Sequence, residues 1–343
     1  MYKILFELTQ EYYLPSFLPI YEEMKKDSGF DIFFRVGPNQ KRYLGIFLIK
    51  QKRKIEAKLK KRGLKITDTY KNYDAVICGT TLKNPQKYGK ALLCNVDHGP
   101  GLKTLRYREF LKQKSTHYHI FVEGQYRIDK FKKYGLDAIE EIHEVGLPKL
   151  DPYFQGDYNP DIIIRKYDLD PRKKTVLYAP SYRPTSIFEI AQTIPTLMDD
   201  YNVMVKLHPY SWQGKYVFEN NMNERISKET ISRVMSQVIN SELLNEDNCS
   251  LILYDLDYST LIHSDGQPLL EDDTKDWLKE SFVHINNPGQ LKSAVEEALY
   301  PSAQRIKALK KDRDYIFSYT DGQAGKRVKR VIEELLKKRE QHE

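Results

Sequence analysis

The chain has 343 residues, of which 40% are hydrophobic and 30% charged, and its formal net charge is +7. This composition is typical of a folded protein with room for two domains, and it excludes a disordered tail. No apolar stretch approaches the roughly 20 residues that a membrane-spanning helix needs. Because the apolar run at the N-terminus is too short for a signal peptide and the three cysteines are widely spaced, we expect a cytoplasmic protein with buried thiols.

The first half of the chain alternates predicted strands and helices. Short apolar runs predict strands at residues 3–8, 31–35, 75–78, 91–96, 118–122 and 141–145. Helical patterns lie between them, at residues 14–26, 51–62 and 126–134. This alternation predicts a parallel sheet with helices on both faces.

A strongly basic segment covers residues 41–65. It contains eleven Lys and Arg and one acid, so its charge of +10 exceeds that of the whole chain. A basic helix beside the apolar run 44–49 suits an anionic membrane surface, where each cation contributes about 1 kcal/mol. A solvated helix face is the plainer interpretation, and nucleic-acid binding lacks any accompanying reader motif. The residues assigned to membrane contact are Lys52, Arg53, Lys60 and Lys61.

A domain boundary is predicted near residue 150, because Gly146 and Pro148 end regular structure and a polar stretch follows. The first domain then covers residues 1–150 and the second covers residues 151–343. A second alternating series has strands at residues 175–179, 202–207, 251–254 and 282–285 and helices at residues 291–299 and 324–338. The last helix could return to the first domain.

His98 follows the predicted strand 91–96, at the carboxyl end where open α/β sheets bind ligands. It could act as a general base near neutral pH, with Asp97 beside it to hold or recharge the ring. Gly99 and Gly101 allow positive φ and close approach of the backbone to a ligand. The alternative is an ordinary polar turn.

Two polar motifs follow the first strands of the second series. Ser181 and Arg183 come after the strand 175–179, and a guanidinium fork suits phosphate. Lys206 and His208 alternate at the end of the next strand, where two neighbouring cationic groups are best explained by an anionic partner. The alternatives are a surface arginine after a proline turn and a purely structural pair.

A third motif contains Asp257, Ser259 and Thr260 and follows the strand 251–254. Two hydroxyls at a strand-to-helix junction can add their donors to the free N–H groups of the helix, which forms a phosphate seat. Taken alone, the pattern favours an ordinary helix N-cap.

The remaining patterns predict neither a metal nor a cofactor. His117 and His119 alternate along the strand 118–122, which favours packing or surface groups over a metal pair. The sequence contains no Cys/His metal spacing, glycine-rich dinucleotide loop, phosphate-binding G-x-x-x-x-G-K-[ST] loop or G-x-S-x-G elbow.

In this order, the motifs resemble those of the CDP-glycerol glycerophosphotransferase family, which primes and polymerises teichoic acids and related surface polymers. The resemblance runs from residue 91 to the C-terminus and includes Leu102-Lys103 after the His-Gly pair. It adds two motifs: Gly146-Leu147-Pro148-Lys149-Leu150-Asp151 and Asp321-Gly322-Gln323-Ala324-Gly325-Lys326-Arg327.

The resemblance implies two Rossmann-like domains that face each other across a cleft, the GT-B arrangement. It implies that an alditol phosphate passes from a CDP-activated donor to a hydroxyl of a lipid-linked saccharide or surface polymer, releasing CMP. Glycerol phosphate is the first expectation for the transferred group. The N-terminal domain would hold the acceptor and the C-terminal domain the donor. The enzyme would lie peripherally on the inner face of the cell membrane, without nucleic acid or cofactor.

The resemblance also implies roles for individual residues. His98 would deprotonate the acceptor, and His208 would protonate the leaving phosphate. The acceptor-side residues are Asp97, Gly99 and Lys103. The residues that hold the donor phosphates and nucleotide are Ser181, Arg183, Lys206, Asp257, Ser259 and Thr260.

Two other functions remain open at this point. A GT-B glycosyltransferase or nucleotide-sugar epimerase of surface polysaccharide synthesis shares the fold and the histidines at strand ends, and donor type separates these enzymes. A non-catalytic, membrane-associated binding subunit would tolerate loss of both His98 and His208.

Overall fold

The computed structural model describes residues 1–37, 46–101, 103–113, 115–156, 159–180, 185–207, 252–254 and 279–342, without the side chains of 46–51 and 253–254. The chain forms two compact units, Met1–Asp157 with Arg313–Glu343 and Tyr158–Asp312. This division differs from the expected ranges 1–150 and 151–343, because the C-terminal segment packs with the first unit.

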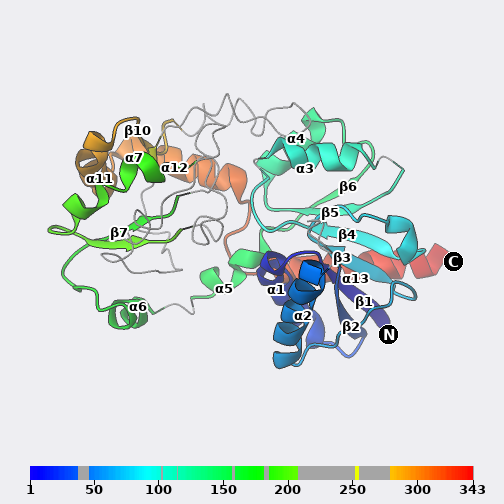
Figure 1. The fold of residues 1–343 in the computed structure, drawn as a ribbon. Helices are drawn as coiled ribbons and strands as arrows, with labels where there is room; N and C mark the ends of the chain where they lie inside the picture. Colours follow the sequence, from blue (N-terminus) through cyan, green and yellow to red (C-terminus); the bar gives the residue numbers. More distant parts are fainter. Residues whose placement is uncertain are drawn as a thin grey trace. The chain divides into compact units, whose positions relative to one another are not determined.

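The first unit contains a sheet of six parallel strands (Figure 1). These are β1 (Tyr2–Leu8), β2 (Phe30–Val36), β3 (Ala75–Cys78), β4 (Leu92–Val96), β5 (His119–Val122) and β6 (Glu141–Glu144). All six coincide with predicted strands, and their order is β2-β1-β3-β4-β5-β6. The order changes direction between β1 and β3, and such a switch point is where open sheets bind ligands beyond the carboxyl ends of the strands.

Helices cover both faces of this sheet (Figure 1). One face carries α1 (Leu14–Lys25), α2 (Ile46–Lys61) and α13 (Ala324–His342), and the other carries α3 (Thr104–Leu111) and α4 (Gln125–Lys133). Shorter helices are η1 (Glu11–Tyr13), η2 (Pro85–Tyr88), η3 (Pro148–Leu150) and α5 (Asp151–Phe154). Because both faces are buried, β1 to β5 are largely apolar, whereas the edge strand β6 is more polar and less buried.

The start of α13 is attached to the start of α5 within the first unit. The carboxylate of Asp151 accepts hydrogen bonds from the backbone N–H groups of Ala324 at 3.0 Å and Gly325 at 2.7 Å. A Cβ at Gly325 would lie 2.7 Å from the backbone of Pro19 in α1, so only glycine permits this helix contact. The motifs at residues 146–151 and 321–327 therefore meet here, and the predicted return of the last helix to the first unit is confirmed.

The second unit has its own apolar core. Its elements are α6 (Pro160–Lys166), β7 (Thr175–Tyr178), α7 (Ile187–Ile190), η4 (Ile194–Leu197), β8 (Asn202–Val205), β9 (Ile252–Tyr254), β10 (Val283–Ile285), η6 (Pro288–Gln290), α11 (Leu291–Leu299) and most of α12 (Ala303–Ile316). In the described part of the unit, β7 pairs with β8 and β9 with β10, both in parallel. The four predicted strands of the second half are confirmed.

Candidate active site in the first unit

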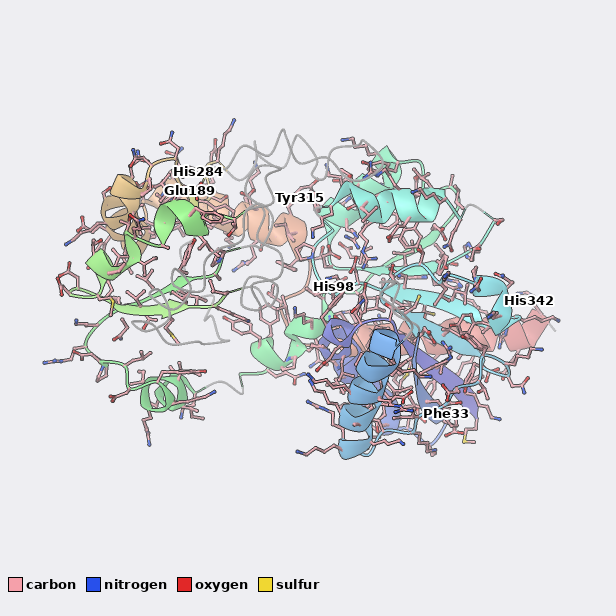
Figure 2. The ribbon with its side chains drawn as sticks, in the orientation of Figure 1. Phe33, His98, Glu189, His284, Tyr315 and His342 are labelled. Carbon is pink, nitrogen blue, oxygen red and sulfur yellow. The ribbon has the colours of Figure 1, made fainter. Side chains whose placement is uncertain are left out.

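Asp97 and His98 follow β4 directly, one strand beyond the switch point between β1 and β3. His98 is labelled in Figure 2. Its imidazole ring lies 4.7 Å from the ring of Tyr12 and 5.0 Å from the ring of Tyr13, measured between centroids. Both tyrosines belong to η1, which follows β1. Residues from the ends of β1 and β4 therefore meet at this edge, as the rule for open sheets predicts.

His98 and Asp97 form a hydrogen-bonded pair. The ring Nδ1 of His98 lies 2.8 Å from Oδ1 of Asp97, which also accepts the backbone N–H of His98 at 2.7 Å. A carboxylate can only accept, so Nδ1 carries the hydrogen and Nε2 keeps its lone pair when the ring is neutral. The side chain of His98 is 39% exposed, so a substrate hydroxyl can reach it.

Two arginines, Arg106 and Arg127, donate hydrogen bonds to the Asp97 carboxylate. Oδ1 accepts from Arg106 at 2.9 Å and Oδ2 from Arg127 at 2.7 Å, and only 6% of the Asp97 side chain is exposed. Burial opposes ionisation, but Arg106, the hydrogen bond from His98 and Arg127 outweigh it and hold the pKa of Asp97 well below its usual range. Asp97 is therefore an anion that orients His98.

The surrounding backbone is shaped by these arginines. Arg106 also donates to the hydroxyl of Tyr13 at 2.9 Å and to the carbonyl of Gly79 at 2.8 Å. A Cβ at Gly101 would lie 1.1 Å from Nη1 of Arg127, so the guanidinium occupies the space of a side chain. The two further bonds of Arg106 fix its position relative to Asp97, and close packing against Gly101 confines Arg127.

Gly99 and Gly101 allow a positive φ, but neither residue adopts one here. Gly101 is required for close approach to Arg127. A Cβ at Gly99 would meet no atom within 4 Å, so Gly99 borders open space beside His98. That space is compatible with the predicted acceptor side.

Lys103 lies at the N-terminal boundary of α3, with an exposed side chain. Partial desolvation and the charge of Arg106 lower the pKa of Lys103, and Asp97 counteracts this in part. The structure thus brings Lys103 into the electrostatic environment of Asp97. Its role on the acceptor side stays a prediction.

The second unit shows only part of the predicted donor site. Lys206 is exposed directly after β8, and its backbone N–H donates to the carbonyl of Tyr178 at 2.9 Å. Because β7 and β8 are parallel neighbours, the residues after Tyr178 and Val205 leave the sheet at one edge. The predicted residues outside the described part of the chain are Ser181, Arg183, His208, Asp257, Ser259 and Thr260.

Residues 46–61 of the basic segment form α2, whose Ile55 and Leu59 are buried in the core. Arg53, Lys60 and Lys61 are exposed. Lys52 differs, because its Nζ lies 2.6 Å from Oδ1 of Asp68, and that hydrogen bond raises the pKa of Lys52. In the described ranges, no helix combines the length and the apolar character needed to cross a bilayer.

Four residues of this site are absent from the sequence-based prediction. Arg106 and Arg127 lie on helices, and nothing in their local sequence points to Asp97. Tyr12 and Tyr13 had a signal, because they follow the first strand as His98 follows the fourth.

Comparison with known proteins identifies related sequences. The family model described as CDP-Glycerol:Poly(glycerophosphate) glycerophosphotransferase matches residues 2–253. A teichoic acid glycerol-phosphate primase of Bacillus subtilis (strain 168) is 27% identical over 147 residues, 41% of this chain and 36% of the relative. The primase of that name from Bacillus spizizenii is 30% identical over 108 residues, 30% of this chain and 28% of the relative. The matches thus span about a third of the length of these relatives.

Solved structures with the same fold cover nearly the whole chain. The wall teichoic acid polymerase TagF aligns with a TM-score of 0.60 at 15% identity, over 98% of this chain and 89% of that protein. A putative UDP-N-acetylglucosamine 2-epimerase from Listeria monocytogenes aligns with a TM-score of 0.57 at 12% identity, over 98% of this chain and 97% of that protein. At these identities the likeness shows the fold alone, and it confirms the predicted GT-B class of two Rossmann-like domains.

Proposed function

The chain belongs to the CDP-glycerol:poly(glycerophosphate) glycerophosphotransferase family, and we propose that it transfers glycerol phosphate from CDP-glycerol to a hydroxyl group, releasing CMP. The acceptor we propose is a lipid-linked saccharide or a surface polymer of the teichoic acid type. The names of the primase relatives support this assignment, as does a structure of a TagF variant soaked with CDPG.

The Asp97–His98 pair carries the proposal. Nε2 of His98 takes the proton from the acceptor hydroxyl, and the resulting oxygen attacks the β-phosphorus of the donor. A new P–O bond forms to the acceptor, and the bond from the β-phosphorus to the bridging oxygen breaks. CMP leaves with that oxygen. Asp97 stabilises the imidazolium that forms, because its carboxylate lies 2.8 Å from Nδ1.

On the donor side we propose that cations and hydroxyls stabilise the charge of the pyrophosphate. Arg183, His208 and Lys206 supply positive charge, and His208 protonates the leaving phosphate. The remaining donor-side residues are Ser181, Asp257, Ser259 and Thr260. The exposed position of Lys206 at the end of β8 supports this assignment.

We further propose that the chain works at the inner, cytoplasmic face of the cell membrane. The exposed cations Arg53, Lys60 and Lys61 on α2 would face anionic lipid, where a lipid-linked acceptor is found. Lys52 contributes less, because Asp68 already neutralises it.

A donor panel tests the assignment. The purified chain is incubated with CDP-glycerol, CDP-ribitol, UDP-N-acetylglucosamine and UDP-glucose, with and without a lipid-linked disaccharide, and nucleotide release is measured. We expect acceptor-dependent CMP release from a CDP-alditol. Release of a nucleoside diphosphate from a nucleotide sugar would instead identify a glycosyltransferase, and conversion of UDP-N-acetylglucosamine without release would identify an epimerase.

A variant pair tests the general base. His98→Ala should lower CMP release by at least about a hundredfold, the usual contribution of a positioned base. His342→Gln, an exposed histidine in the last turn of α13, is the matched control and should leave release unchanged. Near-normal release by His98→Ala would refute the role of this histidine.

A further inference from the structure

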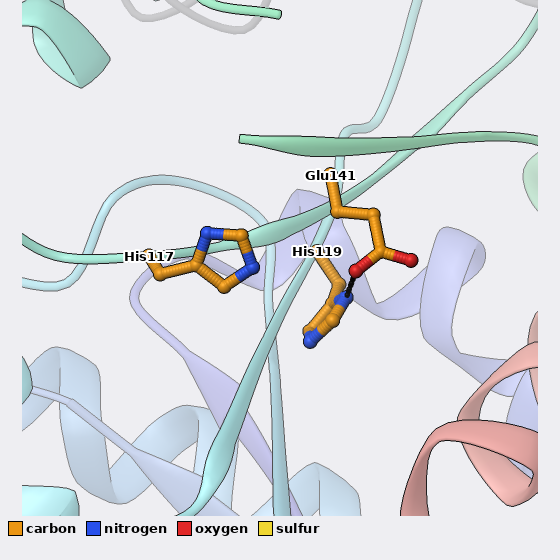
Figure 3. Close-up of side chains that lie close together, drawn as sticks. All are labelled: His117, His119 and Glu141. Carbon is orange, nitrogen blue, oxygen red and sulfur yellow. Dashed lines mark ion pairs between the residues drawn. The ribbon is translucent and has the colours of Figure 1, made fainter. Parts of the chain in front are cut away.

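A cluster of ligating side chains lies at the amino ends of β5 and β6. His119 begins β5 and pairs in register with Glu141, which begins β6. His117 lies two residues before His119, and His143 lies two residues after Glu141. Because side chains alternate along a strand, all four share one face of the sheet. Figure 3 shows His117, His119 and Glu141 close together.

The distances match those of a metal site. Nδ1 of His119 lies 3.3 Å from Oε2 of Glu141 and 3.3 Å from Nε2 of His143. One ligand atom from each of His117, His119 and Glu141 can be chosen so that all lie within 4.8 Å of one another. Ligands about 2.1 Å from a tetrahedral zinc ion are about 3.4 Å apart, so only a small side-chain adjustment closes this arrangement.

The hydrogen bonding of His117 leaves a nitrogen ready for a metal. Its Nδ1 lies 2.9 Å from the carbonyl oxygen of Ile139, which can only accept. Nδ1 therefore carries the hydrogen and Nε2 keeps the lone pair. Histidines that bind metals usually donate their second N–H to a carbonyl or carboxylate in this way.

The other two histidines are neutral at neutral pH. Burial lowers the pKa of His119 to about 4, although Glu141 counteracts the shift. Burial also lowers the pKa of His143, and from α13 Lys338 lowers it further while Glu334 raises it. A metal binds the neutral imidazole through the nitrogen that carries no hydrogen, so each ring needs at most a change of tautomer.

We propose that His117, His119 and Glu141 bind one zinc ion, with His143 within reach of the fourth position. Imidazole and carboxylate suit zinc, whereas magnesium and calcium prefer sites made of oxygen atoms. In the described part of the sheet, β6 is the edge strand and pairs only with β5. A bound ion would therefore connect the edge strand to its neighbour.

This role is structural rather than catalytic. His119 and Glu141 lie at the amino ends of their strands, whereas His98 follows the carboxyl end of β4. In a parallel sheet the amino ends and the carboxyl ends of the strands lie on opposite sides of the sheet. The ion would thus raise the stability of the first unit without touching the reacting groups.

The test uses the full chain, freed of metal with a chelator and titrated with ZnCl₂ by calorimetry. We expect one ion per chain, and no binding of MgCl₂ at the same concentration. His117→Gln and Glu141→Gln should each weaken zinc binding by at least about a hundredfold. His284→Gln, in the second unit, is the matched control and should bind as the unchanged chain does. Equal affinity in all variants, or no binding by the unchanged chain, would overturn the proposal.

Thermal unfolding gives an independent readout. Zinc should raise the melting temperature of the unchanged chain and of His284→Gln, but not that of His117→Gln. Because His117 is exposed, that variant should keep the circular dichroism spectrum of the unchanged chain. An equal rise in melting temperature in His117→Gln would assign the zinc to another place and refute this site.

Discussion

Asp97→Asn tests two effects of the carboxylate that Arg106 and Arg127 hold: its contribution to stability and its orientation of His98. The substitution preserves the size of the side chain but removes its charge. Asp97 accepts from Arg106 at 2.9 Å, from Arg127 at 2.7 Å and from His98 at 2.8 Å. An amide has one acceptor oxygen, so it cannot satisfy all of these donors.

The expected loss of stability follows from burial. The side chain of Arg127 is only 2% exposed, and that of Arg106 is 16% exposed. Removing one partner of a buried ion pair costs about 3–5 kcal/mol, because the remaining charge stays buried with fewer partners. Arg106 keeps Glu109 at 3.2 Å, which places the expected cost at the lower end. Domains are stable by about 5–15 kcal/mol, so the variant should fold with a clearly reduced free energy of unfolding.

The expected loss of turnover follows from the tautomer of His98. An asparagine amide N–H that faces Nδ1 makes Nδ1 the acceptor and moves the ring hydrogen to Nε2, so the base has no lone pair for the substrate. A general base contributes about 10²–10⁴ in rate, and we expect a loss in that range. Urea unfolding measures the first effect, and CMP release from CDP-glycerol at low temperature measures the second.

Glu109→Gln is the matched control for Asp97→Asn. Glu109 also pairs with Arg106, at 3.2 Å, but its side chain is 32% exposed and the pair spans one turn of α3. Its loss should cost less than about 1 kcal/mol and leave turnover intact. Turnover of Asp97→Asn within threefold of the unchanged chain would refute the orienting role. An unchanged free energy of unfolding would refute the importance of burial.

Three further predictions concern stability and membrane contact. The pKa of His119 is about 4 in the folded chain, so between pH 6.5 and 4 only the unfolded chain gains this proton. The free energy of unfolding should therefore decrease as the pH is lowered through this range, by up to about 3 kcal/mol. In metal-free urea unfolding, His119→Gln should show a smaller decline over that window; an identical decline would exclude His119 as its source. Asp151→Ala removes the acceptor of two N–H groups of α13 and should lower the free energy of unfolding by about 1–2 kcal/mol, measured by the same method. An unchanged value would mean that α13 holds without this cap. The third prediction replaces three exposed cations of α2 with Glu: Arg53, Lys60 and Lys61. The variant should sediment less with anionic liposomes but release CMP normally with a soluble acceptor. Equal sedimentation would exclude α2 as the membrane contact.

The strands and the fold class could be predicted from the sequence. Most strands of the first unit are largely apolar local runs, because helices cover both faces of the sheet. The edge strand β6 is more polar, since Glu141, His143 and Glu144 lie in it. The position of His98 could also be predicted, since functional groups in such sheets follow the carboxyl ends of strands. The match of several ordered motifs identified the family, which the family model confirms over residues 2–253.

What surrounds His98 is decided by the tertiary structure. Arg106 and Arg127 reach Asp97 from α3 and α4, 9 and 30 residues further along the chain. In the sequence, His117 and His119 are an alternating pair that favours packing or surface groups. In the structure, the pairing of β5 with β6 places His119 opposite Glu141. The sequence by itself determined the strands, the fold class and the position of His98 after a strand, because each depends on local pattern. Only the fold decided which side chains share a charge or a ligand position, because strand order and helix packing bring together residues that no local pattern connects.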